Sequence, residues 1–239
     1  MKTAIWERNG TVAVVTMTRG ENRHNLAFAR HMCGTFDEIL GDPAVTSVVL
    51  TSSDACYWSV GVDVDWVAER LSEGDQGSVR EFLYALNELF KTMLVYPLPV
   101  IAAINGHVAA NGLVLACACD FRFMRKDRGF ARFPEVDLGI PFLPGMIEIT
   151  AKAVPRHLFE ELKYTGIRMT AAVLEEHHVI TKACDTEEHL LEEVFRFARS
   201  MNKNRAVFGE MKRRMNRTII RVIDEEDPPF IEGGKLWYQ

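Results

Sequence analysis

The chain has 239 residues, of which 48% are apolar and 26% charged, a balance typical of folded globular proteins and unlike that of disordered tails. This length accommodates one or two domains and a core large enough to need neither disulfides nor metals. A net charge of −5 disfavours nucleic acid as a partner, and we expect none. The longest uninterrupted apolar run, residues 113–119, is far shorter than the roughly 20 residues of a membrane span, so we expect no span either.

The cysteines are scattered along the chain and form no zinc-binding pattern. Cys117 and Cys119 lie in an apolar run without a second Cys or His pair nearby. We therefore expect no bound metal and reduced thiols. Charges at Lys2 and Glu7 interrupt the N-terminus too early for a signal peptide, which favours a cytoplasmic location.

The beginning of the chain predicts a hairpin followed by a helix. Residues 4–6 and 11–17 have strand-forming compositions and flank Asn9-Gly10, a strong hairpin signal. Apolar residues then recur at helical spacing over 26–40, and Gly41 ends this helix.

Strands and helices alternate over the next part of the chain. Buried strands are predicted at 47–51, 100–104 and 121–124, and helices at 61–71, 78–95 and from about Ala110. Proline ends the helix at Tyr96-Pro97, and a glycine-bearing turn follows the strand at 100–104. This alternation, without Ser/Gly-rich linkers, predicts an α/β core.

Strands become scarce from Pro144 onward. Helical patterns cover 145–153, 156–164, 170–177, 187–201 and 206–223. The sequence therefore predicts a helical region that follows the α/β core.

Two segments share the order of strand, glycine turn and helix start. They are residues 58–66, which contain Gly61, and residues 99–114, which contain Asn111-Gly112. Backbone N–H groups at the start of a helix have no intrahelical acceptor and can bind developing negative charge. Two such turns side by side would form an oxyanion hole, although either turn alone is also compatible with a purely structural joint.

A third segment, residues 133–141, offers a base. Glu135 lies between Phe133, Pro134 and Leu138, and these apolar neighbours would desolvate its carboxyl group and raise its pKa. A raised pKa suits a general base. The alternative is an ordinary glutamate in a surface loop.

Together, the three segments resemble the crotonase, or enoyl-CoA hydratase/isomerase, superfamily. The patterns S-A-G-A-D, P-V-I-A-A-I-N-G with a small-residue glycine turn, and P-E-x-x-L-G are similar to residues 59–63, 99–112 and 134–139. Residues 22–26 are similar to the segment that borders the CoA nucleotide in these proteins. The resemblance runs over nearly the whole chain, and the motifs match in order and spacing.

The resemblance implies a fold and an assembly. The fold is an α/β crotonase (ClpP-like) superhelix of ββα units with a helical C-terminal trimerisation region. We place the acyl-CoA-binding core at 1–190 and the helical C-terminal region at 191–239. A homotrimer or a dimer of trimers is the implied assembly.

The resemblance also implies site residues. The backbone N–H groups of Val62 and Asn111 would hold the thioester oxygen, and Glu135 would be the catalytic acid–base group. Further contacts with the acyl-CoA substrate are implied at His24, Leu26, Val60, Gly61, Asp63 and Gly112. Coenzyme A is part of this substrate, and no separate cofactor is implied.

One departure from the superfamily's pattern bears on the reaction. Hydratases of the superfamily use two carboxylates, and Val114 occupies the first of these positions here. A single base, Glu135, can instead take a proton from C2 of a 3-enoyl-CoA and return it to C4. We therefore expect an enoyl-CoA isomerase of fatty-acid metabolism. The alternatives are an enoyl-CoA hydratase, another enolate-forming lyase or hydrolase, and a family member that binds acyl-CoA without catalysis.

A basic segment near the C-terminus has two interpretations. Residues 201–223 carry seven Lys and Arg side chains against the single acidic Glu210. These charges could contact the phosphates of CoA, or they could form a solvated helix face or a subunit contact.

Overall fold

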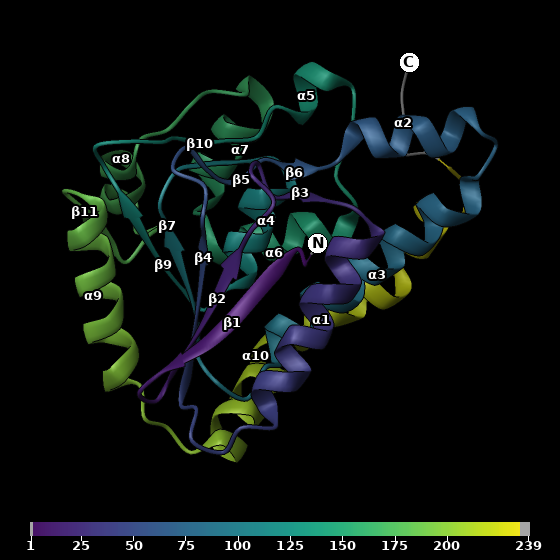
Figure 1. Ribbon diagram of the computed structural model, residues 1–239. Helices are drawn as coiled ribbons and strands as arrows, with labels where there is room; N and C mark the ends of the chain where they lie inside the picture. Colours follow the sequence, from purple (N-terminus) through teal and green to yellow (C-terminus); the bar gives the residue numbers. More distant parts are fainter. Residues whose placement is uncertain (1, 235–239) are drawn as a thin grey trace.

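The computed structural model describes residues 2–234, and a six-stranded sheet runs through it (Figure 1). In spatial order its strands are β1 (Ala4–Asn9), β2 (Val12–Met17), β4 (Ser47–Ser52), β7 (Val100–Ile104), β9 (Phe121–Arg125) and β11 (Lys182–Cys184). β1 and β2 form the predicted antiparallel hairpin, and all other neighbouring pairs are parallel. The α/β core expected from the alternating pattern is therefore present.

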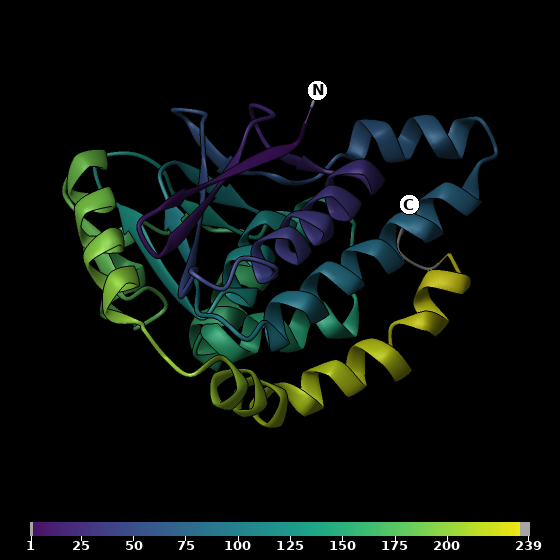
Figure 2. The ribbon, with the colours of Figure 1, turned by 60° about the horizontal axis from the view of Figure 1, so that its bottom comes forward.

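Helices cover both faces of this sheet (Figures 1 and 2). Because side chains alternate along a strand, Val48 and Leu50 of β4 pack in the cluster that includes α1 (Leu26–Leu40) and α3 (Gln76–Val95). Val49, on the opposite face, packs in the cluster that includes α9 (Glu187–Ser200). The expected boundary between residues 190 and 191 thus falls inside α9, which packs on the sheet. The helices that leave the sheet begin after it.

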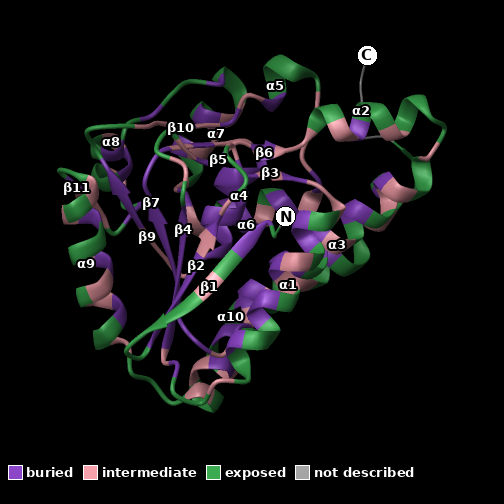
Figure 3. Cartoon of the chain, viewed as in Figure 1, coloured by how far each residue is buried: buried purple, intermediate pink, exposed green. Residues whose placement is uncertain are grey.

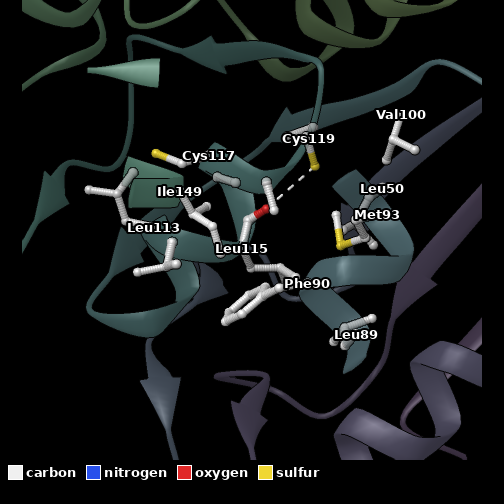
Figure 4. Close-up of a cluster of buried hydrophobic side chains, with 14 of the residues drawn as sticks. Leu50, Leu89, Phe90, Met93, Val100, Leu113, Leu115, Cys117, Cys119 and Ile149 are labelled. Carbon is white, nitrogen blue, oxygen red and sulfur yellow. Dashed lines mark hydrogen bonds between the residues drawn. The ribbon is translucent and has the colours of Figure 1, made fainter. Parts of the chain in front are cut away.

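The helix at the centre of the molecule is α4 (Asn111–Ala118), and all of its residues are buried (Figure 3). Its side chains Leu113 and Leu115 lie among those of neighbouring helices, near Phe90 and Ile149 (Figure 4). At its C-terminal end, the Lys152 ammonium donates to the carbonyl oxygens of Cys117 and Cys119, at 3.0 and 3.1 Å. A cation at this end stabilises the helix and leaves its N-terminal end available for an anion.

Two small sheets position the loops above α4, and of their strands the sequence predicted only the strand end at residues 58–59. One consists of β5 (Tyr57–Ser59), β8 (His107–Ala109) and β10 (Ala131–Arg132), all parallel, and the other pairs β3 (Arg23–His24) with β6 (Gly61–Val62). β8 lies between β7 and α4, where the sequence predicted only a turn. Strands of two or three residues are too short to produce a detectable hydrophobic period.

The remaining helices lie around this core. They are α2 (Val64–Ser72), α5 (Glu135–Leu138), α6 (Pro144–Ala153), α7 (Arg156–Thr165), α8 (Ala171–Glu176), α10 (Arg205–Glu225) and α11 (Pro228–Glu232). α10 packs along α3 and α6, as the rotated view in Figure 2 shows. Residues 235–239 of the expected C-terminal region lie outside the described residues. Over 2–234, no helix combines the length and apolar character that crossing a membrane requires.

Candidate active site

All three segments that were predicted to carry chemistry leave the same edge of one small sheet. β5 and β10 both pair in parallel with β8, so the carboxyl ends of the three strands lie together. This edge of a parallel sheet is where α/β proteins commonly bind ligands. The segments 60–62, 110–111 and 133–135 follow these strand ends directly and are brought together for that reason.

The two glycine turns touch each other at Gly61. A Cβ atom added to Gly61 would lie 2.6 Å from the backbone nitrogen of Asn111 and 3.1 Å from that of Gly112. Gly61 also has a φ of 87°, which residues with a side chain rarely adopt. Both the backbone conformation and the close approach of the turns therefore require glycine at this position.

Two backbone N–H groups are available where the turns meet. The N–H of Asp63 donates to the carbonyl oxygen of His24 at 2.9 Å, and successive N–H groups of a strand point to opposite sides. The N–H of Val62 consequently points away from β3. Asn111 is the first residue of α4, so its N–H has no intrahelical acceptor. The arrangement is suited to hold one oxygen atom between two donors.

A largely apolar cavity of about 220 Å³ opens beside these turns. Val62, Asn111 and Glu135 all line it. The rest of its wall is apolar apart from Arg23 and comes mainly from α2, α3, α6 and residues 138–143. Of the described residues that line the cavity, only Glu135 carries a carboxylate. The cavity thus combines room for an apolar chain with two N–H donors and one acid–base group.

Glu135 begins α5 and is only 6% exposed. Its Oε2 lies 3.7 Å from Nζ of Lys163, too far for a hydrogen bond, and neither atom has another hydrogen-bond partner within residues 2–234. The Lys163 ammonium lies 2.7 Å from the centre of the Phe142 ring. This carboxylate oxygen is therefore held by packing and by one nearby cation.

Burial raises the pKa of the Glu135 carboxyl group to about 7, and the Lys163 ammonium opposes this rise. Burial likewise lowers the pKa of Lys163 to about 8, against the attraction of Glu135. The raised pKa agrees with the expectation from the apolar neighbours of Glu135. Of the apolar neighbours expected to desolvate Glu135, Phe133 is buried as expected, whereas Leu138 is 58% exposed. A carboxyl group of this pKa can both accept and release a proton near neutral pH.

Four of the other predicted site residues lie on or beside the turns. Val60 lines the cavity, and Gly61 forms the contact between the turns. Gly112 packs so closely on β5 that an added Cβ would lie 2.4 Å from the carbonyl oxygen of Ser59. The carboxylate of Asp63 caps α2 by accepting from the N–H of Trp66 at 3.3 Å.

The segment expected to border the nucleotide lies next to a second, polar cavity of about 260 Å³. Asn25, Ala27 and Asp63 line this cavity, and Leu26 lies between the first two in the chain. The ring of His24 is fully buried behind the turns and lines neither cavity. Any contact of His24 with a ligand must therefore use its main chain.

The basic segment is largely occupied within the chain. Arg205 donates to three carbonyl oxygens of residues 40–45, and the buried Lys212 pairs with Asp120 at 2.8 Å. Arg213 and Arg214 both pair with Glu210. These contacts favour the structural interpretation of the segment for most of its charges.

Lys163 was not predicted as part of the site. It lies 28 residues beyond Glu135 in the sequence, and only the packing of α7 against α5 brings the two together. The sequence does contain one signal that could have drawn attention to Lys163. It follows Phe159 by four residues, which places its charge on the same helix face as a large apolar side chain.

Comparison with known proteins identifies the family. The sequence profile of the enoyl-CoA hydratase/isomerase family matches residues 7–226, which is most of the chain. The chain belongs to this family. The prediction of the crotonase superfamily is thereby confirmed.

Relatives within the family include both isomerases and hydratases. Enoyl-CoA delta isomerase 1, peroxisomal, of Arabidopsis thaliana is 26% identical over 207 residues, which cover 84% of each chain. Enoyl-CoA delta isomerase 3 of the same plant is 31% identical over 56% of this chain, and the match spans 57% of that relative's length. The short-chain-enoyl-CoA hydratase of Clostridium acetobutylicum is 30% identical over 72% of this chain and 64% of its own.

Solved structures of the family confirm the fold. An enoyl-CoA hydratase from Bacillus halodurans superposes with a TM-score of 0.86 at 17% identity, covering 96% of this chain and 92% of that one. A protein of Mycobacterium tuberculosis, called an enoyl-CoA isomerase in one structure and a probable enoyl-CoA hydratase in another, superposes with TM-scores of 0.85 and 0.86 at 20% identity. The two matches cover 97% and 98% of this chain and 98% and 97% of that one. The expected crotonase fold with C-terminal helices is therefore correct.

Proposed function

We propose that this protein is an enoyl-CoA isomerase of fatty-acid metabolism that moves the double bond of a 3-enoyl-CoA to the 2 position. The observation that supports this most strongly is the single carboxylate, Glu135, in the described wall of the cavity shared by Val62 and Asn111. Val114, at the position where the family's hydratases carry a second carboxylate, is fully buried and lies outside that wall. One group that accepts and returns a proton suffices for isomerisation, whereas addition of water is natural work for two.

The mechanism uses the two ends of the cavity. The thioester oxygen accepts hydrogen bonds from the N–H groups of Val62 and Asn111. The Glu135 carboxylate removes a proton from C2, and the electron pair of that C–H bond moves into a dienolate whose charge rests on the thioester oxygen. The protonated Glu135 then returns the proton to C4, which leaves the double bond between C2 and C3. A donor in such a hole contributes about 2.7–4 kcal/mol to transition-state stabilisation.

The surroundings of Glu135 support both halves of this cycle. A pKa near 7 leaves a large fraction of the group ionised at neutral pH and still allows it to release the proton it has taken. The apolar wall suits the acyl chain, and we place the CoA arm along Val60–Asp63 and the main chain of His24–Leu26. No cofactor other than the CoA of the substrate is required for these steps.

An enoyl-CoA hydratase is the second candidate, because hydratases stand beside isomerases among the relatives. This reaction would need a group besides Glu135 to hold or protonate the reacting atoms. Lys163 does not supply it from the substrate side, since it lines a different cavity, behind Glu135. A non-catalytic acyl-CoA-binding protein would need no carboxylate with a raised pKa in the cavity at all.

For the assembly we propose a homotrimer or a dimer of trimers, with α10 at the contact. Val207, Met211 and Met215 recur every four residues on this helix and are 62%, 53% and 75% exposed. Such an exposed apolar stripe is typical of a protein interface. We place the protein in the cytoplasm, where its cysteines, free over the described chain, would stay reduced.

The test compares isomerisation of 3-hexenoyl-CoA with hydration of crotonyl-CoA on one preparation of the protein. We expect isomerisation to dominate, and Glu135→Gln to slow it by roughly 10²–10⁴-fold. Glu160→Gln is the matched control, because Glu160 lies on the cavity behind Glu135 and not on the substrate side. An unchanged rate in Glu135→Gln would exclude this mechanism. Faster hydration than isomerisation would favour the hydratase, and tight binding without turnover would favour the non-catalytic alternative.

A further inference from the structure

The buried ring of His24 joins the two turns that carry the proposed N–H donors. Its Nδ1 lies 2.8 Å from Oδ1 of Asn111, and its Nε2 lies 2.9 Å from Oγ of Ser59. Asn111 carries one donor on its own backbone. Ser59 lies just before Gly61 and Val62, the turn that carries the other. One side chain therefore makes a hydrogen bond to each turn.

The main chain of His24 holds the residue next to the second donor. β3 pairs with β6 so that His24 lies opposite Val62, and the carbonyl oxygen of His24 accepts from the N–H of Asp63 at 2.9 Å. The backbone of His24 thus fixes the strand that contains Val62, and its ring fixes the side chain of Asn111. A single residue contacts both halves of the hole.

The ring itself has no room to move. It is 0% exposed and stacks on Phe28, with the ring centres 4.3 Å apart and the planes at 14°. The hydroxyl of Ser59 also lies 2.9 Å from the carbonyl oxygen of Asn22 and accepts from the N–H of Gly61 at 3.2 Å. The partners at both ring nitrogens and the stacked Phe28 ring together restrict rotation of the His24 side chain.

We propose that the buried ring of His24 is a positioning group, which sets the separation and direction of the Val62 and Asn111 N–H groups and does not itself touch the substrate. This inference rests on the proposed function of these two groups as an oxyanion hole. Its physical basis is that N–H donors act on a developing charge only when they are already fixed at the right place. A displacement of about 1 Å in such a group can cost about 10²-fold in rate.

The Asn111 side chain has a role in this arrangement that glycine could not fill. Its Oδ1 lies against the His24 ring, and its amide nitrogen donates to Sδ of Met146 at 3.5 Å. Met146 lines the substrate cavity. The side chain of Asn111 is therefore the link between the ring and the start of α4, where the donor lies.

The experiment measures enolate stabilisation separately from binding. Acetoacetyl-CoA serves as the probe, because its enolate absorbs in the near ultraviolet, and calorimetry gives its dissociation constant in the same buffer. For His24→Leu we expect a 10- to 100-fold lower kcat with 3-hexenoyl-CoA, a KM within about threefold of wild type, and a weaker enolate band at saturation. His24→Gln, which retains a hydrogen-bonding group, should recover part of both signals.

Two further variants separate positioning from folding. Ser59→Ala removes one of the two ring contacts and should give a smaller loss of kcat than His24→Leu. Ile39→Val, in the core of the same α1 cluster and far from the turns in sequence, should lower the melting temperature without changing kcat. These variants keep the test usable if His24→Leu folds poorly.

The possible outcomes are distinct. Wild-type protein that neither isomerises 3-hexenoyl-CoA nor forms the enolate would overturn the proposed function itself. Wild-type activity that persists at full kcat, with an unchanged enolate band, in folded His24→Leu and His24→Gln would overturn only the role of His24. Loss of kcat and of the enolate band, with binding retained, would support it.

Discussion

At one end of the cavity, the turns of Val62 and Asn111 are tied together by hydrogen bonds through His24 and Ser59. At the other end, Oε2 of Glu135 makes no hydrogen bond to any residue of 2–234 and faces the Lys163 ammonium at 3.7 Å. The neighbourhoods differ as well, because the turns are buried or half-buried whereas Val136 and Leu138, next to Glu135, are more than half exposed.

The difference corresponds to the two tasks that we propose for these ends. A group that stabilises charge must stay in one place, and a dense hydrogen-bond network provides this. A group that carries a proton between two carbons must change its charge and keep a pKa near neutrality, which burial opposed by nearby cations provides. The comparison predicts that damage to the first end alters geometry, and damage to the second alters pH dependence.

Of the variants that test this comparison, the one that forces the two turns apart should have the largest effect. In Gly61→Ala the new Cβ would meet the backbone nitrogen of Asn111 at 2.6 Å, so the turns must separate and a donor is lost. We expect kcat/KM for 3-hexenoyl-CoA to fall by about 10²–10³-fold. Steady-state kinetics and thermal unfolding on the same samples measure this.

The matched control for that variant is Gly74→Ala. Gly74 also has a positive φ, of 75°, but no atom of the described residues lies within 4 Å of its Cβ position. The Gly74→Ala variant should therefore be less stable than the wild type, because of backbone strain, but should keep its activity. Equal activity losses in the two variants would show that the contact between the turns is not what matters.

A smaller, pH-dependent effect is expected from Lys163→Met. The Lys163 ammonium favours the ionised form of Glu135, so its removal raises the pKa of that carboxyl group above about 7. Arg132, which also lowers that pKa, remains. Since the base must be ionised, the rising limb of kcat/KM against pH should move to higher pH. The rate at pH 7 should fall several-fold and recover in alkaline buffer.

Two results would contradict this assignment. A pH profile that coincides with that of the wild type would mean that Lys163 does not act on Glu135. A uniform loss at every pH would indicate damaged packing instead. Lys126→Met, which removes a surface lysine paired with Asp185, is the control for a general effect of charge.

The smallest effect should appear at the start of α4. Ala110 has φ 53° and ψ −136°, a backbone conformation that strongly favours glycine. Ala110→Gly should therefore raise the free energy of unfolding by about 1 kcal/mol, which urea denaturation can measure. Ala109→Gly, one residue earlier in β8, should lower it by about 0.5–1 kcal/mol. A destabilised Ala110→Gly variant would show that the strain is not real.

Much of the fold could be predicted from sequence because the long elements carry their own signals. α1 begins and ends as predicted, with Asn25 as its N-cap and Gly41 at its C-terminal end. The expected strand end at residues 58–59 is β5, but β8 and β10 could not be found, since two or three residues give no period. α2 begins at Val64 and not at Gly61, because residues 61–62 form a strand instead.

The site shows the same division. The two turns and Glu135 were predicted because each has a local pattern, and the small parallel sheet places them together. Lys163 and the ring of His24 depend on contacts between distant segments. The pairing of His24 with Asn111 joins residues 87 positions apart, and no spacing rule connects them. Such contacts are set by tertiary packing, which a single sequence does not reveal.

The two faces of α10 have a consequence for how the protein responds to its surroundings. Inward, Asn216 donates to the carbonyl oxygen of Leu94 at the end of α3, and Lys212 pairs with Asp120 just after α4. Outward, the same helix exposes Val207, Met211 and Met215. A second protomer that bound to the outer stripe would therefore contact a helix that is itself hydrogen-bonded and ion-paired to the ends of α3 and α4. Both of these helices contribute residues to the proposed substrate cavity. If dilution, or a single charged substitution in that stripe, dissociates the assembly, the turnover number should then change together with the molecular mass.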